Sequence, residues 1–277
     1  MKSFAVSIFI CIVFSSCNTP QRIEVDQYTP NESFDQNWAM NKLWEDGLAE
    51  VAQYKAEMVI YGKSRSFDQT FITVKEEFNS EWNVKTDDYD RGDLFSVMKV
   101  NKFARIETDN YPYHYLSSLF YKREQPDQLY KMTHTGQEWC GNTFKQFSIE
   151  GANYDYDYNS YFDGTGDGEM QINGTDYLWE DQLSYALRAL KFEDGLTFQT
   201  PLVEAQINTK VRKPTIYNAK LSVADKNNLW QVEVYLDADK TNIYTFEKEY
   251  PNLLISQRSW NGYNLELDSV SRYQYWR

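Results

Sequence analysis

The chain has 277 residues, with 28 Lys and Arg against 41 Asp and Glu, which gives a formal net charge of −13. A protein that binds nucleic acid neutralises the phosphate backbone with clustered basic side chains, so the excess of acidic residues argues against nucleic acid as a partner. Aromatic residues make up 17% of the chain, a proportion that excludes a disordered protein and indicates a sizeable core.

The first sixteen residues have the pattern of a secretory signal peptide. Lys2 supplies a positive charge, residues 4–14 form an apolar stretch, and Ser15 and Ser16 are the small residues expected before a cleavage site. The apolar stretch is too short to cross a bilayer as a finished helix. We therefore predict that residues 1–16 are a signal peptide that is removed.

Cys17 follows directly, and the string Phe14-Ser15-Ser16-Cys17 resembles the lipobox of bacterial lipoproteins, with Phe where Leu is more usual. The resemblance implies acylation of Cys17, and several acyl chains on one residue make a stable membrane anchor. The alternative is a secretory signal without lipid. The next residue is not Asp, which by the same resemblance favours a periplasm-facing outer-membrane location.

Residues 17–36 are predicted to be a flexible tether, because the run after Cys17 is polar and holds two prolines. Residues 37–277 are then expected to form a single large antiparallel β domain. Residues 38–44 are a candidate short helix. Within residues 98–106, apolar side chains occupy alternate positions with Lys102 as the exception, the pattern of a strand with one buried face.

His134 and Cys140 are the pair that most suggests catalysis, because a Cys and a His can together form a thiolate nucleophile. No papain-like signature surrounds Cys140, and a single cysteine beside Trp139 is typical of a buried small hydrophobe. We predict that Cys140 packs beside Trp139 and that the protein is not an enzyme. The many carboxylates single out no glycosidase pair by their spacing.

Tyr154, Tyr156 and Tyr158 alternate with polar residues, which on a strand puts a tyrosine stripe on one face. The stripe is suited to stacking sugar rings or binding a protein, and it is equally typical of an ordinary half-buried strand.

Asp163, Asp167 and Glu169 have the spacing of the first half of a calcium loop and are a candidate metal site. The loop departs from that pattern at its twelfth position, where Gly174 stands in place of a bidentate Glu. The alternative is a tight turn between strands, since such turns also collect Asp and Gly.

One segment has helical instead of strand periodicity. Trp179, Leu183 and Leu187 fall at helical spacing within residues 177–191, and Asp176 stands at an N-cap position. Beyond this predicted helix, alternation returns in strands over residues 217–223, 230–237 and 243–248. The strands follow one another without the long crossovers that a parallel sheet needs.

Two family resemblances add to this pattern. The string over residues 180–190, followed by alternating strands that end near 263–267, is similar to an uncharacterised family of secreted bacterial proteins. That resemblance covers residues 176–277 and implies a helix on a curved sheet related to lipoprotein-carrier half-barrels. The aromatic-rich region containing residues 72–78 and 137–144 resembles uncharacterised lipoproteins of Flavobacteria, within the Bacteroidetes.

The sequence thus predicts a mainly β protein, with a curved antiparallel sheet forming a half-barrel or open barrel and the 177–191 helix on its concave face. The first hypothesis is a non-enzymatic, membrane-anchored lipoprotein without a cofactor that binds an apolar ligand or an envelope protein on that face. Its candidate ligand residues are Trp179, Leu183, Leu187, Tyr217 and Trp230. The alternative is a lipoprotein that binds glycans through exposed Trp and Tyr, and a hydrolase comes third.

Overall fold

The computed structural model describes residue 29 and residues 31–277, so the predicted signal peptide and Cys17 lie outside the described residues. In the described part, sixteen strands form one sheet. The strands are β1 (Ala49–Ile60), β2 (Lys63–Asn79), β3 (Val84–Lys85), β4 (Leu94–Ile106), β5 (Tyr113–Lys122), β6 (Lys131–Glu138), β7 (Gly141–Glu150), β8 (Asn153–Ser160), β9 (Asp167–Asn173), β10 (Leu178–Trp179), β11 (Thr197–Val203), β12 (Ile216–Lys226), β13 (Leu229–Asp237), β14 (Lys240–Glu247), β15 (Leu254–Arg258) and β16 (Asn264–Tyr273).

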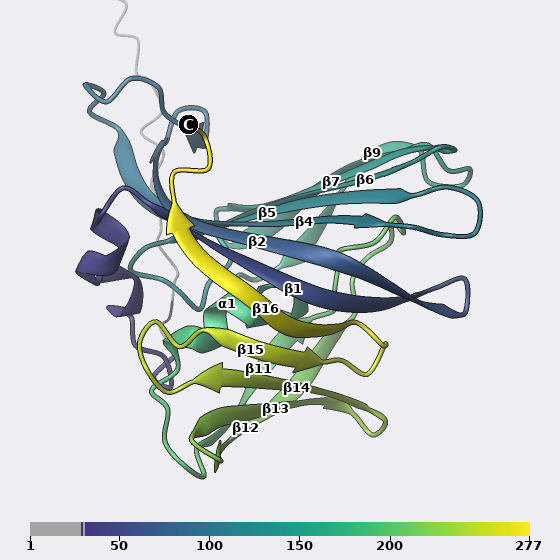
Figure 1. The fold of residues 1–277 in the computed structure, drawn as a ribbon. Helices are drawn as coiled ribbons and strands as arrows, with labels where there is room; N and C mark the ends of the chain where they lie inside the picture. Colours follow the sequence, from purple (N-terminus) through teal and green to yellow (C-terminus); the bar gives the residue numbers. More distant parts are fainter. Residues whose placement is uncertain (1–28, 30) are drawn as a thin grey trace, which may run out of the picture.

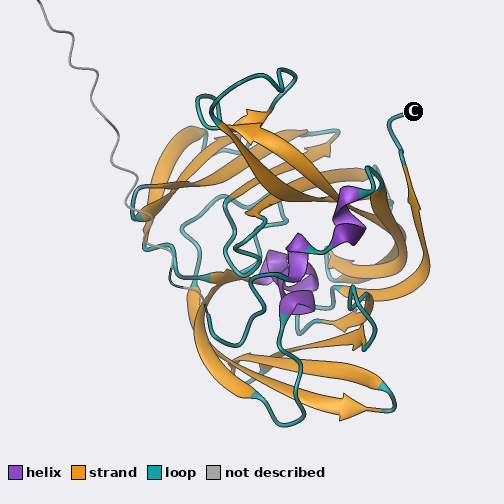
Figure 2. Cartoon of the chain, turned by 90° about the vertical axis from the view of Figure 1, so that its left-hand side faces the viewer, coloured by secondary structure: helices purple, strands orange, loops and turns teal. Residues whose placement is uncertain are grey.

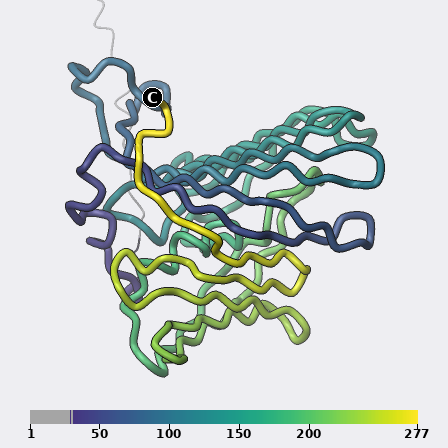
Figure 3. Tube along the Cα trace, viewed as in Figure 1, coloured from purple at the N-terminus to yellow at the C-terminus, as the bar shows by residue number. Residues whose placement is uncertain are grey.

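The sheet runs in the order β10-β11-β12-β13-β14-β15-β16-β1-β2-β4-β5-β6-β7-β8-β9, with β3 beside β2. All neighbours are antiparallel except β10 and β11, which are parallel, and β16 pairs with β1, so the first and last strands of the described residues lie side by side. The sheet curls strongly, as the ribbon and the backbone trace both show (Figures 1 and 3). Because its last strands, β9 and β10, do not pair with each other, the barrel is open. This confirms the predicted fold class.

The segment after β10 lies inside the curve of the sheet (Figure 2). It consists of η3 (Glu180–Gln182), α1 (Leu183–Ala186) and η4 (Leu187–Ala189), so only one α-helical turn replaces the long helix predicted over residues 177–191. All of residues 178–190 are buried. The leucine spacing therefore reflects burial on every side instead of one helical face, and the backbone is extended at both Trp179 and Leu190.

The N-terminal part of the described chain packs against this inner segment. Phe34 is 1% exposed and forms an isolated antiparallel bridge with Leu190, so the prediction that the tether extends to residue 36 is wrong at its C-terminal end. The burial of the apolar Phe34 side chain fixes this stretch to the domain. The mostly polar residues around Phe34 gave no sign of this contact. The candidate helix at 38–44 is two short 3-10 turns, η1 (Trp38–Met40) and η2 (Lys42–Glu45).

The alternating faces predicted for β12 and β13 do point to the same side. Ala219, Leu221, Val232 and Val234 are each 0% exposed and belong to one core cluster with Trp179 and its neighbours. None of the helices in the described residues is long and apolar enough to cross a membrane.

Candidate functional site

The concave face of the sheet is filled by the segment that lies inside it. Trp179, Leu183 and Leu187 are each 0% exposed. The Trp179 ring meets those of Phe147 and Tyr154 at centroid distances of 4.9 and 5.1 Å. Burial of each large apolar side chain is worth roughly 1.5–3 kcal/mol, so these contacts stabilise a core. The main surface grooves of the described residues are lined by other side chains.

The other two predicted ligand residues lie at opposite ends of the β12–β13 pair. Trp230 is half-buried and stacks on Phe192, with Lys248 over its ring at 4.6 Å. Tyr217 is half-buried under Lys240, whose Nζ donates a hydrogen bond of 3.0 Å to the Tyr217 hydroxyl. The structure therefore does not bring the five predicted ligand residues into one cavity.

A buried polar network ties the inner segment to the sheet. Lys102 on β4 donates from Nζ to the Asp181 backbone oxygen at 2.6 Å and to Ser184 Oγ at 2.8 Å. The Asp181 carboxylate accepts from the Gln206 backbone N–H at 2.6 Å. Lys145 on β7 donates to the Gln206 backbone oxygen at 3.0 Å. Burial in this network lowers the pKa of both lysines to about 8.

Glu180 extends the network toward β14. Its carboxylate accepts from Asn242 Nδ2 at 2.9 Å and from the Ala205 backbone N–H at 3.1 Å. Burial raises the pKa of both Glu180 and Asp181. Carboxyl and amine groups with shifted pKa values are common in active sites. Here they are buried and bonded mainly to the backbone of the inner segment and of the loop after β11, which identifies a structural network.

His134 and Cys140 are not a catalytic pair. His134 is 0% exposed, and its Nδ1 lies 2.9 Å from Ser117 Oγ inside the sheet. Cys140 is exposed in the β6–β7 turn, where its Sγ lies 3.4 Å from the Tyr111 hydroxyl. The prediction that Cys140 is packed beside Trp139 is wrong, because a two-residue turn leaves both side chains at the tip of the hairpin, with Trp139 78% exposed.

The candidate metal loop does not form a cluster of ligands. The Asp163 carboxylate accepts from the Gly164 backbone N–H, and Asp167 accepts from Asn159 Nδ2. Glu169 is exposed on β9. Across residue 29 and residues 31–277, no group of three or more His, Cys, Asp or Glu side chains is arranged to hold a metal ion. The loop is a connector between β8 and β9.

The tyrosine stripe on β8 faces the core. Tyr154 and Tyr156 are 0% exposed, and Tyr158 is half-buried beside them. The stripe therefore packs the inside of the sheet and offers no surface for a ligand.

An aromatic cluster does reach solvent, at the end of the sheet where the β1–β2, β4–β5 and β6–β7 turns lie (Figure 1, right). We call Tyr61, Tyr111, Tyr113 and Trp139 the hairpin-end cluster. Tyr111 stacks on Trp139 with 6.0 Å between centroids, and Tyr61 and Tyr113 join through their hydroxyls. Tyr61 is 70% exposed and Trp139 is 78% exposed.

Tyr61 occupies a backbone position that disfavours it. Tyr61 and Gly62 form the two-residue turn between Ile60 and Lys63, with φ of 53° and 73°. Positive φ at both central residues is a type I′ turn, for which Asn-Gly is preferred and a bulky first residue is strained. Strained positions cluster at functional sites, so the tyrosine at this turn points to a role for its side chain.

Gly141 allows a further aromatic residue to approach the β6–β7 turn. A Cβ at Gly141 would lie 2.3 Å from the Tyr161 ring, so only glycine permits this contact. Tyr161 is 67% exposed and its backbone N–H donates to the Asn142 oxygen at 3.1 Å. Exposed rings thus come from three different turns of the same end of the sheet, and the half-buried Tyr111 comes from a fourth.

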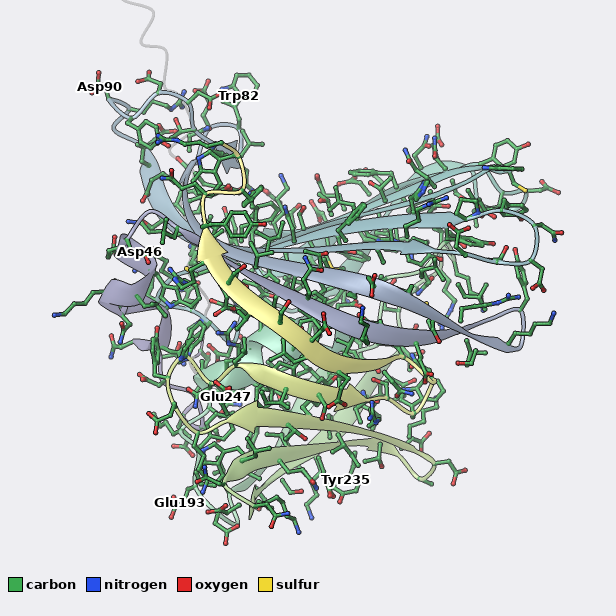
Figure 4. All side chains as sticks on the ribbon, in the orientation of Figure 1. Asp46, Trp82, Asp90, Glu193, Tyr235 and Glu247 are labelled. Atoms are coloured by element: carbon green, nitrogen blue, oxygen red, sulfur yellow. The ribbon has the colours of Figure 1, made fainter. Side chains whose placement is uncertain are left out.

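A groove of about 720 Å³ lies at the other end of the sheet, lined by Leu43, Tyr250, Leu253 and Val270 among others. Glu247, labelled in Figure 4, is one of its acidic residues. Glu50 also lines the groove and forms a buried bidentate ion pair with Arg188 at 2.7 and 2.9 Å. The volume of the groove falls within the usual range for small-molecule sites, roughly 300–1,000 Å³.

Comparison with known proteins gives a fold likeness only. No family model and no curated protein matches the chain. One similar solved structure is a β-barrel-like protein of Brucella abortus from a domain family of unknown function, DUF1849, with a TM-score of 0.49 and 8% identity over 82% of this chain and 98% of that one. Another is a DUF1089 family protein of Pseudomonas aeruginosa, with a TM-score of 0.38 and 12% identity over 65% of this chain and 87% of that one.

Sequence reasoning did not find the hairpin-end cluster, although two signals for it were present. Tyr61 stands directly before Gly62 and Trp139 two residues before Gly141, in each case between alternating segments. Glycine between two alternating segments marks a turn. Only the register of the sheet shows that these turns lie at the same end.

Proposed function

We propose that the protein is a non-enzymatic binding protein of the bacterial envelope that recognises carbohydrate through the hairpin-end cluster. The observation that carries this proposal is the exposure of Tyr61 and Trp139 at 70% and 78%, on two-residue turns of one sheet. An exposed aromatic ring has an apolar face for the C–H groups of a sugar ring, and tyrosine adds a hydroxyl that can hydrogen-bond. Large aromatic residues exposed together mark interaction sites.

Charged side chains lie beside the Tyr61 turn. Asp109 in the β4–β5 turn accepts from Lys63 and Arg65 at 2.6 and 2.8 Å, which fixes a charged rim beside the Tyr61 turn. Planar polar groups beside aromatic faces are suited to the hydroxyl groups of a sugar. The net charge of −13 argues against a nucleic acid as the stacked ligand.

We further propose that acylated Cys17 anchors this domain in the outer membrane, facing the periplasm. The support is the signal-peptide pattern of residues 1–16 and the lipobox-like string. Metabolic labelling with a palmitate analogue should mark the wild-type protein and should not mark Cys17→Ser. Equal labelling of the two proteins would contradict the anchor.

The glycan proposal is tested by probing an array of immobilised glycans with the purified protein and with Trp139→Ala. We expect the wild type to bind a defined set of glycans and Trp139→Ala to lose this binding. Trp82→Ala is the matched control, because Trp82 is 66% exposed at the other end of the sheet (Figure 4). An array without binding, or equal loss in both variants, would contradict the proposal.

A second candidate function is the binding of an apolar ligand, favoured by the 720 Å³ groove beside Leu253 and Val270. Organic extraction of the purified protein should then release a lipid. The variant Val270→Arg, which puts a charge at the rim of the groove, should co-purify with less of it. Absence of lipid from the wild-type extract would leave only the glycan proposal.

A further inference from the structure

The strand β9 ends the sheet, and its outer edge has no strand partner in the described part of the chain. Its inner edge pairs with β8 from Asn153↔Asn173 to Asn159↔Asp167. Backbone hydrogen bonds at both ends of the pair join Ser160 to Gly166 and Gly174 to Ala152. The alternation of an antiparallel ladder then assigns Gly168, Met170 and Ile172 to bonds with β8.

The backbone groups of Asp167, Glu169 and Gln171 consequently point away from β8. Such a row of unpaired N–H and C=O groups is a template for an added strand. The same three side chains are exposed on the outer face of the sheet, while Met170 and Ile172 face the core side and are half-buried and buried.

The charges around this edge specify what can be added to it. Asp155, Asp157, Asp167 and Glu169 lie on β8 and β9, which contain no Lys or Arg. Asp157 is directly opposite Glu169, and like charges opposite each other are destabilising. A second copy of β9 added to this edge would bring more carboxylates against these, so pairing between copies of the chain is disfavoured.

We propose that β9 binds an extended segment of a partner protein in which basic and apolar residues alternate. Lys or Arg side chains of the added strand would lie opposite Asp167 and Glu169 on the outer face, within the distance at which cross-strand pairs interact. The intervening apolar side chains would lie beside Met170 and Ile172. The sheet gains one strand, and the carboxylates gain the counter-charges that β8 and β9 lack.

The test uses fluorescein-labelled heptapeptides and the purified protein, with fluorescence anisotropy as the readout. The peptide Lys-Val-Lys-Val-Lys-Val-Lys should bind, and Glu-Val-Glu-Val-Glu-Val-Glu should bind at least about tenfold more weakly. Equal binding of the two peptides, or no binding of either, would overturn the proposal.

Backbone pairing is tested from the peptide side, where folding of the protein is not at risk. We take the added strand to run antiparallel to β9, like the other strands around it. Lys residues opposite Asp167 and Glu169 then form hydrogen-bonded pairs, so the Lys N–H groups bond to β9 and the Val N–H groups point away. Methylation of the Lys backbone nitrogens should abolish binding, and methylation of the Val backbone nitrogens should weaken it much less. Equal effects would show that the peptide is held by charge alone and would overturn strand addition.

Two protein variants complete the test. Gln171→Pro removes an outward N–H and not a bond to β8, a substitution that edge strands tolerate, and it should weaken binding. Glu169→Lys should weaken binding more than Asp268→Lys, which makes the same charge change on exposed Asp268 of β16. If both charge reversals act equally, the site on β9 is wrong.

Discussion

The inside of the curved sheet and its hairpin end are built from the same residue types and have opposite relations to water. Inside, Tyr154, Tyr156 and Trp179 are each 0% exposed, whereas Tyr61 and Trp139 at the hairpin end are 70% and 78% exposed. Inner rings add their burial to a continuous core, while the outer rings gain little from packing and one of them, Tyr61, occupies a strained turn position. Aromatic content therefore identifies a binding surface only once each ring is known to be buried or exposed.

The largest effect is expected from Trp179→Ala. Truncating a fully buried tryptophan leaves a cavity and should lower the free energy of unfolding by about 3–5 kcal/mol. The same truncation at the exposed end, Trp139→Ala, should change stability by less than about 0.5 kcal/mol. Urea unfolding of the two variants measures both. A small effect at Trp179 would mean that the concave face is loosely packed, and would restore the interior as a candidate ligand cavity.

A pH effect should separate the interior from the surface in a second way. Burial lowers the pKa of His134 from 6.5 to about 3. Between these values the unfolded chain binds a proton that the folded protein does not, so stability is present above pH 6.5 and is lost as the pH falls. The expected loss from His134 alone is about 2 kcal/mol between pH 6.5 and pH 5.

The measurement is urea unfolding at both pH values for the wild type and for His134→Gln, which keeps a polar side chain that does not titrate. The carboxyl groups contribute to the slope of both proteins, so the difference between the slopes isolates His134. Parallel slopes would show that His134 is accessible to water and protonates in the folded protein.

The smallest effect is expected at Cys140. Because its thiol is exposed in the β6–β7 turn, Cys140→Ala should change the free energy of unfolding by less than about 0.5 kcal/mol. The wild-type thiol should react with a maleimide while the protein is folded. Reaction only after unfolding would contradict the exposed position of the turn.

The sequence was sufficient for the fold class because strand alternation is a local signal. The faces of β12 and β13 are where their alternation predicted, since a period of two fixes which side chains share a face. Helical spacing at residues 177–191 was misleading for a physical reason. Residues 178–190 are buried on all sides, so an apolar residue fits at any position and the pattern no longer reports the backbone conformation.

The candidate site was less predictable, because it depends on contacts between segments that are distant in the chain. The tyrosines of β8 were candidates and are core residues, while Tyr61, Tyr111 and Trp139 come together only through strand pairing. The prediction for Cys140 rested on the general preference of free cysteines for burial. It was wrong because Cys140 lies in a hairpin turn, where its side chain is exposed. The average burial of a residue type does not determine the exposure of one residue, which depends on its place in the strand register.

The most direct test of the account is the variant Tyr61→Asn. Asn-Gly is the preferred pair for the type I′ turn, so the substitution should keep the free energy of unfolding unchanged or raise it by up to about 1 kcal/mol. It also removes an exposed ring from the hairpin-end cluster. We predict that Tyr61→Asn is at least as stable as the wild type and binds the glycans selected on the array at least about tenfold more weakly. Unchanged glycan binding by a stable Tyr61→Asn would contradict the claim that this end of the sheet is the binding surface.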